Sequence, residues 1–210
     1  LSRLVAEGVR GVTSNPTIFQ KAIGGSSEYD QQLREVPPGI SNEKAYEALA
    51  ISDIQRACDE LRPIYNRLDA RDGFVSLEVS PALAYDTVGT VEAAKRLATA
   101  VGRPNIMIKV PGTEAGVPAI AELIGAGINI NVTLLFSVSG YRTVVSAYID
   151  GLTTLAKNGP TVPEGHPVNR IGSVASFFVS RVDTAVDEAL PDGSPLLGTA
   201  AVANAKVAYS

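Results

Sequence analysis

Residues 105–112 read NIMIKVPG, and this stretch decides the fold. A β-branched, apolar run that stops at Pro-Gly is typical of a strand. Side chains of a strand alternate between two faces, so the isoleucines and the valine share one face while Met107 and Lys109 share the other. We therefore predict a strand whose apolar face packs against helices and whose second face carries Lys109 near the carboxyl end.

Strands and helices alternate along the rest of the chain. Four further segments have strand character: Val9–Asn15, Phe74–Val79, Ile128–Val132 and Ile171–Phe178. Helical segments are expected at 41–66, 87–101, 113–124 and 138–157, and again from residue 179 onward. Five strands, each followed by a helix, predict a parallel sheet covered by helices. No G-x-G-x-x-G pattern follows a strand, which argues against a dinucleotide-binding sheet.

The polar residues of these strands fall on one parity, towards the carboxyl ends. They are Asn15, Ser76, Glu78, Lys109, Asn129, Asn131 and Ser176, with Thr133 and Phe178 next in line. In a barrel this parity points inward, and its last members surround the mouth, where barrel enzymes keep their active sites. An open, doubly wound sheet predicts no such convergence. The pattern therefore favours an α/β fold of the (β/α)8 TIM-barrel type.

Lys109 is the first candidate for catalysis. Burial disfavours an ammonium ion, and a neutral amine can attack a carbonyl to form a Schiff base. Glu78 is expected one strand away, where it can act as a proton shuttle through water. The alternatives are that Lys109 extends to solvent at the strand end and that the two residues form a structural ion pair.

Other polar residues at the same ends are candidates for substrate binding. Asn15, Asn131 and Thr133 are neutral hydrogen-bonding groups suited to substrate hydroxyls, although Asn-Pro at 15–16 is also ordinary turn chemistry. Arg181 lies in the first turn of an expected helix, where a phosphate would gain both backbone amides and a guanidinium. Its alternative is a surface pair with Asp183 or Glu188.

Composition limits the functional class. The 210 residues are 45% hydrophobic and 19% charged, with a net charge of −4 and no basic run, which argues against nucleic acid as a partner. A single Cys58 and a single His166 exclude a disulfide framework and leave a zinc site short of ligands. We expect His166, in the Pro- and Gly-rich stretch 158–169, to be exposed and outside the site. No apolar run reaches the ~20 residues of a membrane helix, so we expect a cytoplasmic protein without a membrane partner.

Five ordered motifs carry a resemblance to a known family. They are GVTSNPTIFQKAI (11–23), SLEVSPALAYDT (76–87), IMIKVPGTEAGVPAI (106–120), INVTLLFS (130–137) and SVASFFVSRVD (173–183). Together they cover nearly all of the chain and resemble the transaldolase family, in its longer bacterial subgroup. The resemblance implies a class I aldolase-type barrel of which strands 2 to 6 are present, as one partial domain over residues 1–210.

The resemblance implies a catalytic set. Lys109, in the KVPGT motif, would be the Schiff-base lysine, and Glu78 would transfer protons around the imine with a bound water and Thr133. The reaction would move a dihydroxyacetone unit from fructose 6-phosphate or sedoheptulose 7-phosphate to an aldose phosphate, in the pentose phosphate pathway. No metal or organic cofactor is implied, because the imine itself is the electron sink.

The resemblance also implies a substrate-binding set. Asn15, Asn131 and Ser176 would hold substrate hydroxyls, Phe178 would shape the pocket, and Arg181 would bind the sugar phosphate. Sugar phosphates are thus the expected partners, and the oligomeric state stays open.

One feature of the family has no counterpart in these residues. The family carries an acid/base aspartate on its first barrel strand, and neither Asp30 nor Asp53 matches it by motif. We expect the natural polypeptide to extend past both ends and these 210 residues alone to be inactive. The alternatives are a fructose-6-phosphate aldolase-like lyase and a non-catalytic barrel that binds sugar phosphates. A parent fused to a phosphoglucose isomerase is also left open.

Overall fold

A five-stranded parallel sheet forms the centre of the computed structural model, which describes residues 1–210. The strands are β1 Val12–Thr13, β2 Val75–Glu78, β3 Ile106–Pro111, β4 Ile130–Leu135 and β5 Ser173–Phe177. Each strand pairs in parallel with the next strand of the sequence. This sequential order is that of a barrel wall, whereas a doubly wound sheet reverses its strand order midway. The predicted α/β barrel class is confirmed, with five strands and an open inner face.

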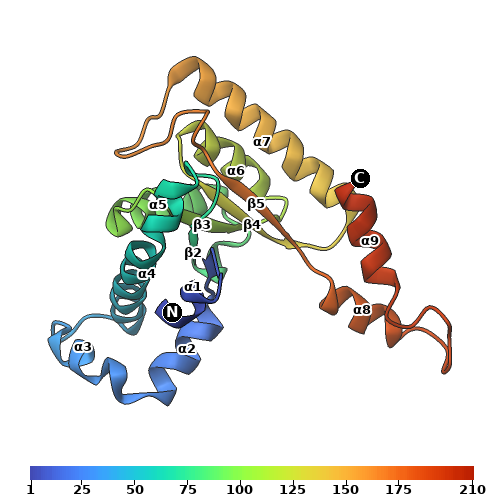
Figure 1. Cartoon of the computed structure of the whole chain (residues 1–210), viewed down its shortest axis with the longest axis horizontal. Coiled ribbons are helices and arrows are strands. Elements are labelled where there is room, and N and C mark those ends of the chain that lie inside the picture. Colours follow the sequence, from blue (N-terminus) through green and yellow to red (C-terminus); the bar gives the residue numbers. More distant parts are fainter.

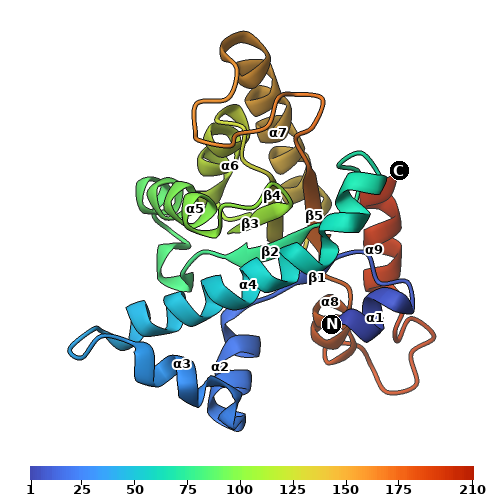
Figure 2. The ribbon, with the colours of Figure 1, turned by 60° about the vertical axis from the view of Figure 1, so that its left-hand side comes forward.

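Helices flank this sheet, and four of them cover one of its faces. The helices are α1 Ser2–Ala6, α2 Pro16–Gly25, α3 Asp30–Glu35, α4 Asn42–Arg67, α5 Thr87–Val101, α6 Gly116–Gly125, α7 Val138–Asn158, α8 Ser180–Asp187 and α9 Ala200–Tyr209, with 3-10 turns at Ser27–Tyr29 and Pro81–Leu83. Helices α4 to α7 lie along the curled sheet, while α8 and α9 extend from its β5 edge as an arm (Figures 1 and 2). None of the helices combines the length and apolar composition that crossing a membrane demands.

Capping residues explain where the long helices begin and end. The side chains of Ser41, Asp86 and Ser137 each accept a hydrogen bond from a backbone amide in the first turn of α4, α5 and α7. Helix α5 ends at Gly102, whose φ of 57° lies in the left-handed region that glycine tolerates. The predicted bounds of α5 are therefore confirmed to the residue, and those of α4 and α7 within one residue.

Besides shifted strand ends and the short helices α1 and α3, three elements differ from the sequence prediction. The first strand is only Val12–Thr13 long, because Asn15, two residues further on, already caps α2. Helix α2 was not predicted, although Asn15 caps it and Pro16 occupies its first turn. Helix α6 starts at Gly116, because the Thr113 hydroxyl donates to the Ala84 carbonyl as well as accepting from the Gly116 amide.

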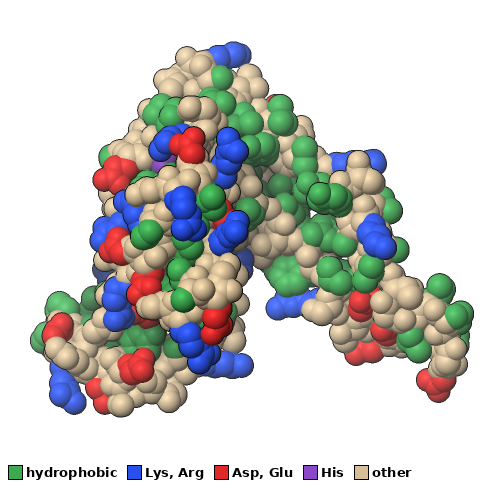
Figure 3. All heavy atoms as spheres, viewed as in Figure 1, with side chains coloured by type: hydrophobic (Ala, Val, Ile, Leu, Met, Phe, Trp, Pro, Cys, Tyr) green, Lys and Arg blue, Asp and Glu red, His purple; other side chains and the backbone are tan.

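The hydrophobic core lies between the sheet and the helices. The outward-facing strand residues are buried there: Val75, Leu77, Ile106, Ile108, Val110, Ile130 and Val132. The apolar parity read from the sequence is thus confirmed. The opposite face has no such cover: Val174 on β5 is 45% exposed, and a hollow of about 660 Å3 is lined by Phe74, Met107 and Asn131. Figure 3 shows hydrophobic side chains exposed in the notch between the body and the α8–α9 arm.

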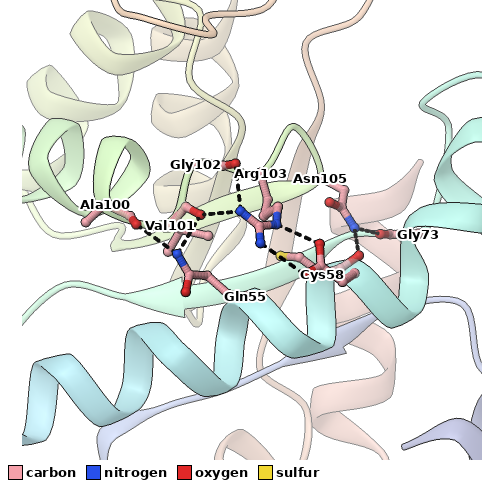
Figure 4. Close-up of polar contacts among 9 residues, drawn as sticks. Gln55, Cys58, Gly73, Ala100, Val101, Gly102, Arg103 and Asn105 are labelled. Carbon is pink, nitrogen blue, oxygen red and sulfur yellow. Dashed lines mark hydrogen bonds and ion pairs between the residues drawn. The ribbon is translucent and has the colours of Figure 1, made fainter.

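Polar contacts fasten α4 to the amino ends of the strands (Figure 4). The Asn105 carboxamide donates to the Cys58 carbonyl at 2.9 Å, and Gln55 donates to two carbonyls at the end of α5. Arg103 forms a two-pronged ion pair with Asp59 on α4. Cys58 is fully buried, and burial raises the pKa of its thiol to about 12. This end of the barrel wall is therefore held by structural contacts, on the opposite edge from the candidate site.

The prediction that His166 is exposed is wrong. The loop after α7 folds back over the amino end of β4, where the His166 amide donates to the Gly127 carbonyl at 2.8 Å. Gly127 has a φ of 89°, and a Cβ there would lie 2.9 Å from the His166 backbone. The His166 side chain is left 9% exposed. Desolvation lowers the pKa of His166, partly opposed by the Pro104 carbonyl.

We predict that His166 makes stability fall in mild acid. Its pKa is lower in the folded than in the unfolded chain, so the unfolded state takes up the proton first as pH falls below about 6.5. Because the chain has one histidine, His166→Gln isolates this contribution. Urea unfolding at pH 7.5 and pH 5.5 should show a larger loss in the unsubstituted chain than in the variant. Equal losses in both would contradict the prediction.

Candidate active site

Lys109 and Glu78 meet on the inner face of the sheet. The β2–β3 register pairs Glu78 with Lys109, so both side chains leave the sheet on the same face at adjacent positions. The Lys109 Nζ atom lies 3.3 Å from Glu78 Oε2, and the side chains are 10% and 17% exposed. Lys109 therefore does not extend to solvent, and its charge is balanced by the neighbouring strand.

Asn131 lies on the other side of Lys109 and is held by two serines. The β3–β4 register pairs Lys109 with Asn131. The Asn131 Nδ2 atom donates to Ser76 Oγ at 3.0 Å, and Ser176 Oγ donates to Asn131 Oδ1 at 2.9 Å. These two bonds link β2, β4 and β5 across β3, and they hold the plane of the Asn131 carboxamide between the two hydroxyls. Ser76 was not assigned a role from the sequence, although its place two residues before Glu78 was the available signal.

Thr133 follows Asn131 on the same face and is 1% exposed. The backbone changes direction directly after it, because Leu134 has a φ of 61° and a β-bulge interrupts the β4–β5 register. Left-handed backbone in a leucine costs about 1–2 kcal/mol, and such strain is concentrated at functional sites. The bulge ends the inward-facing row at Thr133 and turns Leu135 into the core under the helices.

Asn15 is placed apart from this cluster. Its Oδ1 atom accepts the Ile18 amide at 2.9 Å and caps α2, so the turn chemistry considered from the sequence is present. No hydrogen bond joins Asn15 to Lys109, Glu78 or Asn131. Its carboxamide nitrogen stays available, and its strand neighbours the one that carries Glu78.

Phe178 and Arg181 form a separate contact just beyond β5. The Arg181 guanidinium carbon lies 4.8 Å from the centre of the Phe178 ring. Arg181 forms no ion pair, so the surface pair with Asp183 or Glu188 is absent. It stands in the first turn of α8, where its charge is free for an anion. The Phe136 ring, which was not assigned a role from the sequence, stacks on Phe178.

Glu78 also borders a cavity whose lining does not include Lys109. This cavity of about 280 Å3 between β2, α4 and α5 is lined by Glu78, Tyr46 and Pro16. Burial raises the pKa of Tyr46, and the negative charge of Glu78 raises it further. Glu78 thus contacts a lysine and also borders a cavity that can hold water, and both are features that a proton shuttle needs.

We predict strong coupling between Lys109 and Glu78 in stability. Glu78→Gln removes the partner of a nearly buried ammonium and should lower the unfolding free energy by about 2–4 kcal/mol. Adding Lys109→Met should restore more than half of the loss, since no unpaired charge remains. Urea unfolding of the four proteins measures the cycle. Additive effects of the two substitutions would show that the pair does not interact.

Comparisons with known proteins identify the family of the chain. Residues 1–210 match the family described as Transaldolase/Fructose-6-phosphate aldolase. The chain is 47% identical to "Transaldolase 1" of Streptomyces avermitilis, with 100% of this chain and 56% of the relative covered. It is 49% identical to the transaldolase of Thiobacillus denitrificans, over 100% of this chain and 58% of the relative. The chain spans about half the length of the curated relatives it matches, and it belongs to the transaldolase and fructose-6-phosphate aldolase family.

Proposed function

We propose that the whole protein is a transaldolase that uses Lys109 as its Schiff-base nucleophile. It transfers a dihydroxyacetone unit from fructose 6-phosphate or sedoheptulose 7-phosphate to an aldose phosphate acceptor. The single observation that carries the proposal is the nearly buried Lys109, 3.3 Å from Glu78 on the inner face of the barrel wall. The names of the relatives support the same reaction.

Lys109 and Glu78 divide the chemistry between them. Loss of a proton from the ammonium frees the Nζ lone pair, which attacks the ketose carbonyl carbon and gives a carbinolamine. Glu78, acting through a bound water, returns a proton to the carbinolamine hydroxyl. The protonated hydroxyl leaves as a second water molecule, and the imine forms. The C4 hydroxyl then gives up its proton, in the family to the acid/base aspartate of the first barrel strand. The electron pair of the C3–C4 bond moves to the protonated imine, so the aldose phosphate departs as an aldehyde and an enamine of dihydroxyacetone stays on Lys109. Thr133, two residues beyond Asn131, is proposed to hold the water with Glu78.

The remaining candidates are proposed to orient the sugar. Asn131 and Ser176 are hydrogen-bonded to each other, but each can still donate or accept a further hydrogen bond with a substrate hydroxyl. Asn15 contributes its carboxamide nitrogen from the β1–α2 connection. Arg181 binds the phosphate, supported by its lack of an ion-pair partner and its place at the start of α8. Phe178 is proposed to exclude water from the imine.

Two rival functions predict different products. A fructose-6-phosphate aldolase-like lyase releases dihydroxyacetone without an acceptor, whereas a transferase needs an acceptor aldose for turnover. The aromatic ring of Phe178 favours the transferase, because it limits the access of water to the imine. A mere sugar-phosphate binder has no use for a buried lysine. The pentose phosphate pathway in the cytoplasm is the proposed setting, as the single thiol of Cys58 suits a reducing compartment.

Borohydride trapping tests the nucleophile. We expect the full-length protein, reduced in the presence of fructose 6-phosphate, to carry one sugar adduct on the peptide that contains Lys109. Lys109→Met should abolish the adduct, while Lys157→Met, at the end of α7, serves as the matched control and should retain it. Peptide mass mapping reads the result. An adduct on another lysine would overturn the site, and no adduct in a folded protein would favour the binder.

We also expect residues 1–210 alone to show no transaldolase turnover. The inner face that carries Lys109 is open along the β5 side, so water reaches any imine formed there. The assay compares this chain with the full-length protein at equal concentration, after circular dichroism shows that both are folded. Equal turnover would show that the five-stranded wall is sufficient.

A further inference from the structure

The β-bulge in β4 decides which residue faces Phe178. Val132 pairs with Ala175 but Leu135 pairs with Phe177, so three steps along β4 match two along β5. A regular register would place Leu135 opposite Phe178. With the extra residue, Leu134, in the left-handed conformation, Leu135 pairs with Phe177, and the residues that follow the two strands, Phe136 and Phe178, come side by side.

The two rings use this placement to stack. Their centroids lie 5.1 Å apart with an interplanar angle of 22°. The Phe178 amide donates to the Leu135 carbonyl at 2.8 Å, which holds the two chain segments together. Asn204 of α9 donates to the Phe136 carbonyl at 2.8 Å and fixes the backbone from the other side. The stack therefore rests on a backbone that is fastened on both sides.

Phe136 does not serve as an ordinary core residue. It remains 42% exposed, so filling the core is not its main contribution. The Phe178 ring that it contacts is also the ring that holds the Arg181 guanidinium. No ion pair restrains Arg181, so the aromatic face is the contact that limits the rotamers of its long side chain.

We propose that Phe136 is a positioning residue: it fixes the Phe178 ring and, through that ring, the Arg181 guanidinium that receives the substrate phosphate. The proposal rests on the proposed function of Arg181. The ligand class is a phosphate monoester of a sugar, and an unphosphorylated sugar gains nothing from the arrangement. The strained backbone at Leu134 has a use in this account, because it is what brings Phe136 beside Phe178.

Steady-state kinetics of the full-length protein tests the role of Phe136. Phe136→Leu keeps an apolar side chain but loses the ring face. It should raise KM for fructose 6-phosphate about five- to tenfold, the factor that an aromatic stacking energy gives in an equilibrium constant, with kcat changed less than about twofold. Phe136→Tyr keeps the face and should restore KM. With unphosphorylated fructose as donor, Phe136→Leu should leave kcat/KM unchanged.

A cycle with Arg181→Ala decides whether Phe136 acts through the guanidinium. In the Arg181→Ala background, Phe136→Leu should produce no further rise in KM for fructose 6-phosphate. An equal rise in both backgrounds, or equal losses with both donors, would overturn the proposal. Borohydride trapping of the unsubstituted protein tests the proposed function separately. If Lys109 is trapped but Phe136→Leu leaves KM for fructose 6-phosphate unchanged, only the role of Phe136 is refuted.

Discussion

The parallel pairing of β2 with β3 is the constraint on which the rest of the structure depends. This register sets Glu78 beside Lys109, and each charge is tolerable in a nearly buried position only because the other is there. The alternate residues of both strands are apolar and fill the core beneath the helices. A slip of one residue would send the charges into that core, so one register satisfies both faces at once.

The inner face is organised outward from that pair. Asn131, the next residue across the sheet from Lys109, is oriented by Ser76 and Ser176, so the side chains bordering the lysine are fixed before any substrate arrives. Beyond Thr133 the inner face changes, from small polar side chains to the stacked rings of Phe136 and Phe178 with Arg181 beside them. The bulge at Leu134 provides the change of direction at the cost of local strain.

Much of this arrangement is readable from the sequence, since it follows from periodicity and capping. The inward row and the caps of the long helices are local signals, and the adjacency of Glu78 and Lys109 follows once consecutive strands pair in parallel. The features that were missed depend on tertiary contacts. His166 is buried because the loop folds onto Gly127. Phe136 contacts Phe178 because of a β-bulge whose left-handed residue is Leu134, so no glycine in the sequence indicates the bulge. Asn15 shows how one motif can combine a helix cap with a candidate binding role.

A crystal structure of the full-length protein, reduced with borohydride in the presence of fructose 6-phosphate, would show directly whether Lys109 is the nucleophile. We expect continuous density from Lys109 Nζ to the sugar, with Glu78 beside the new bond, Asn131 on the hydroxyls and the phosphate at Arg181. Density that joins the sugar to another residue, or a sugar bound with Lys109 still paired to Glu78 and unmodified, would contradict this expectation.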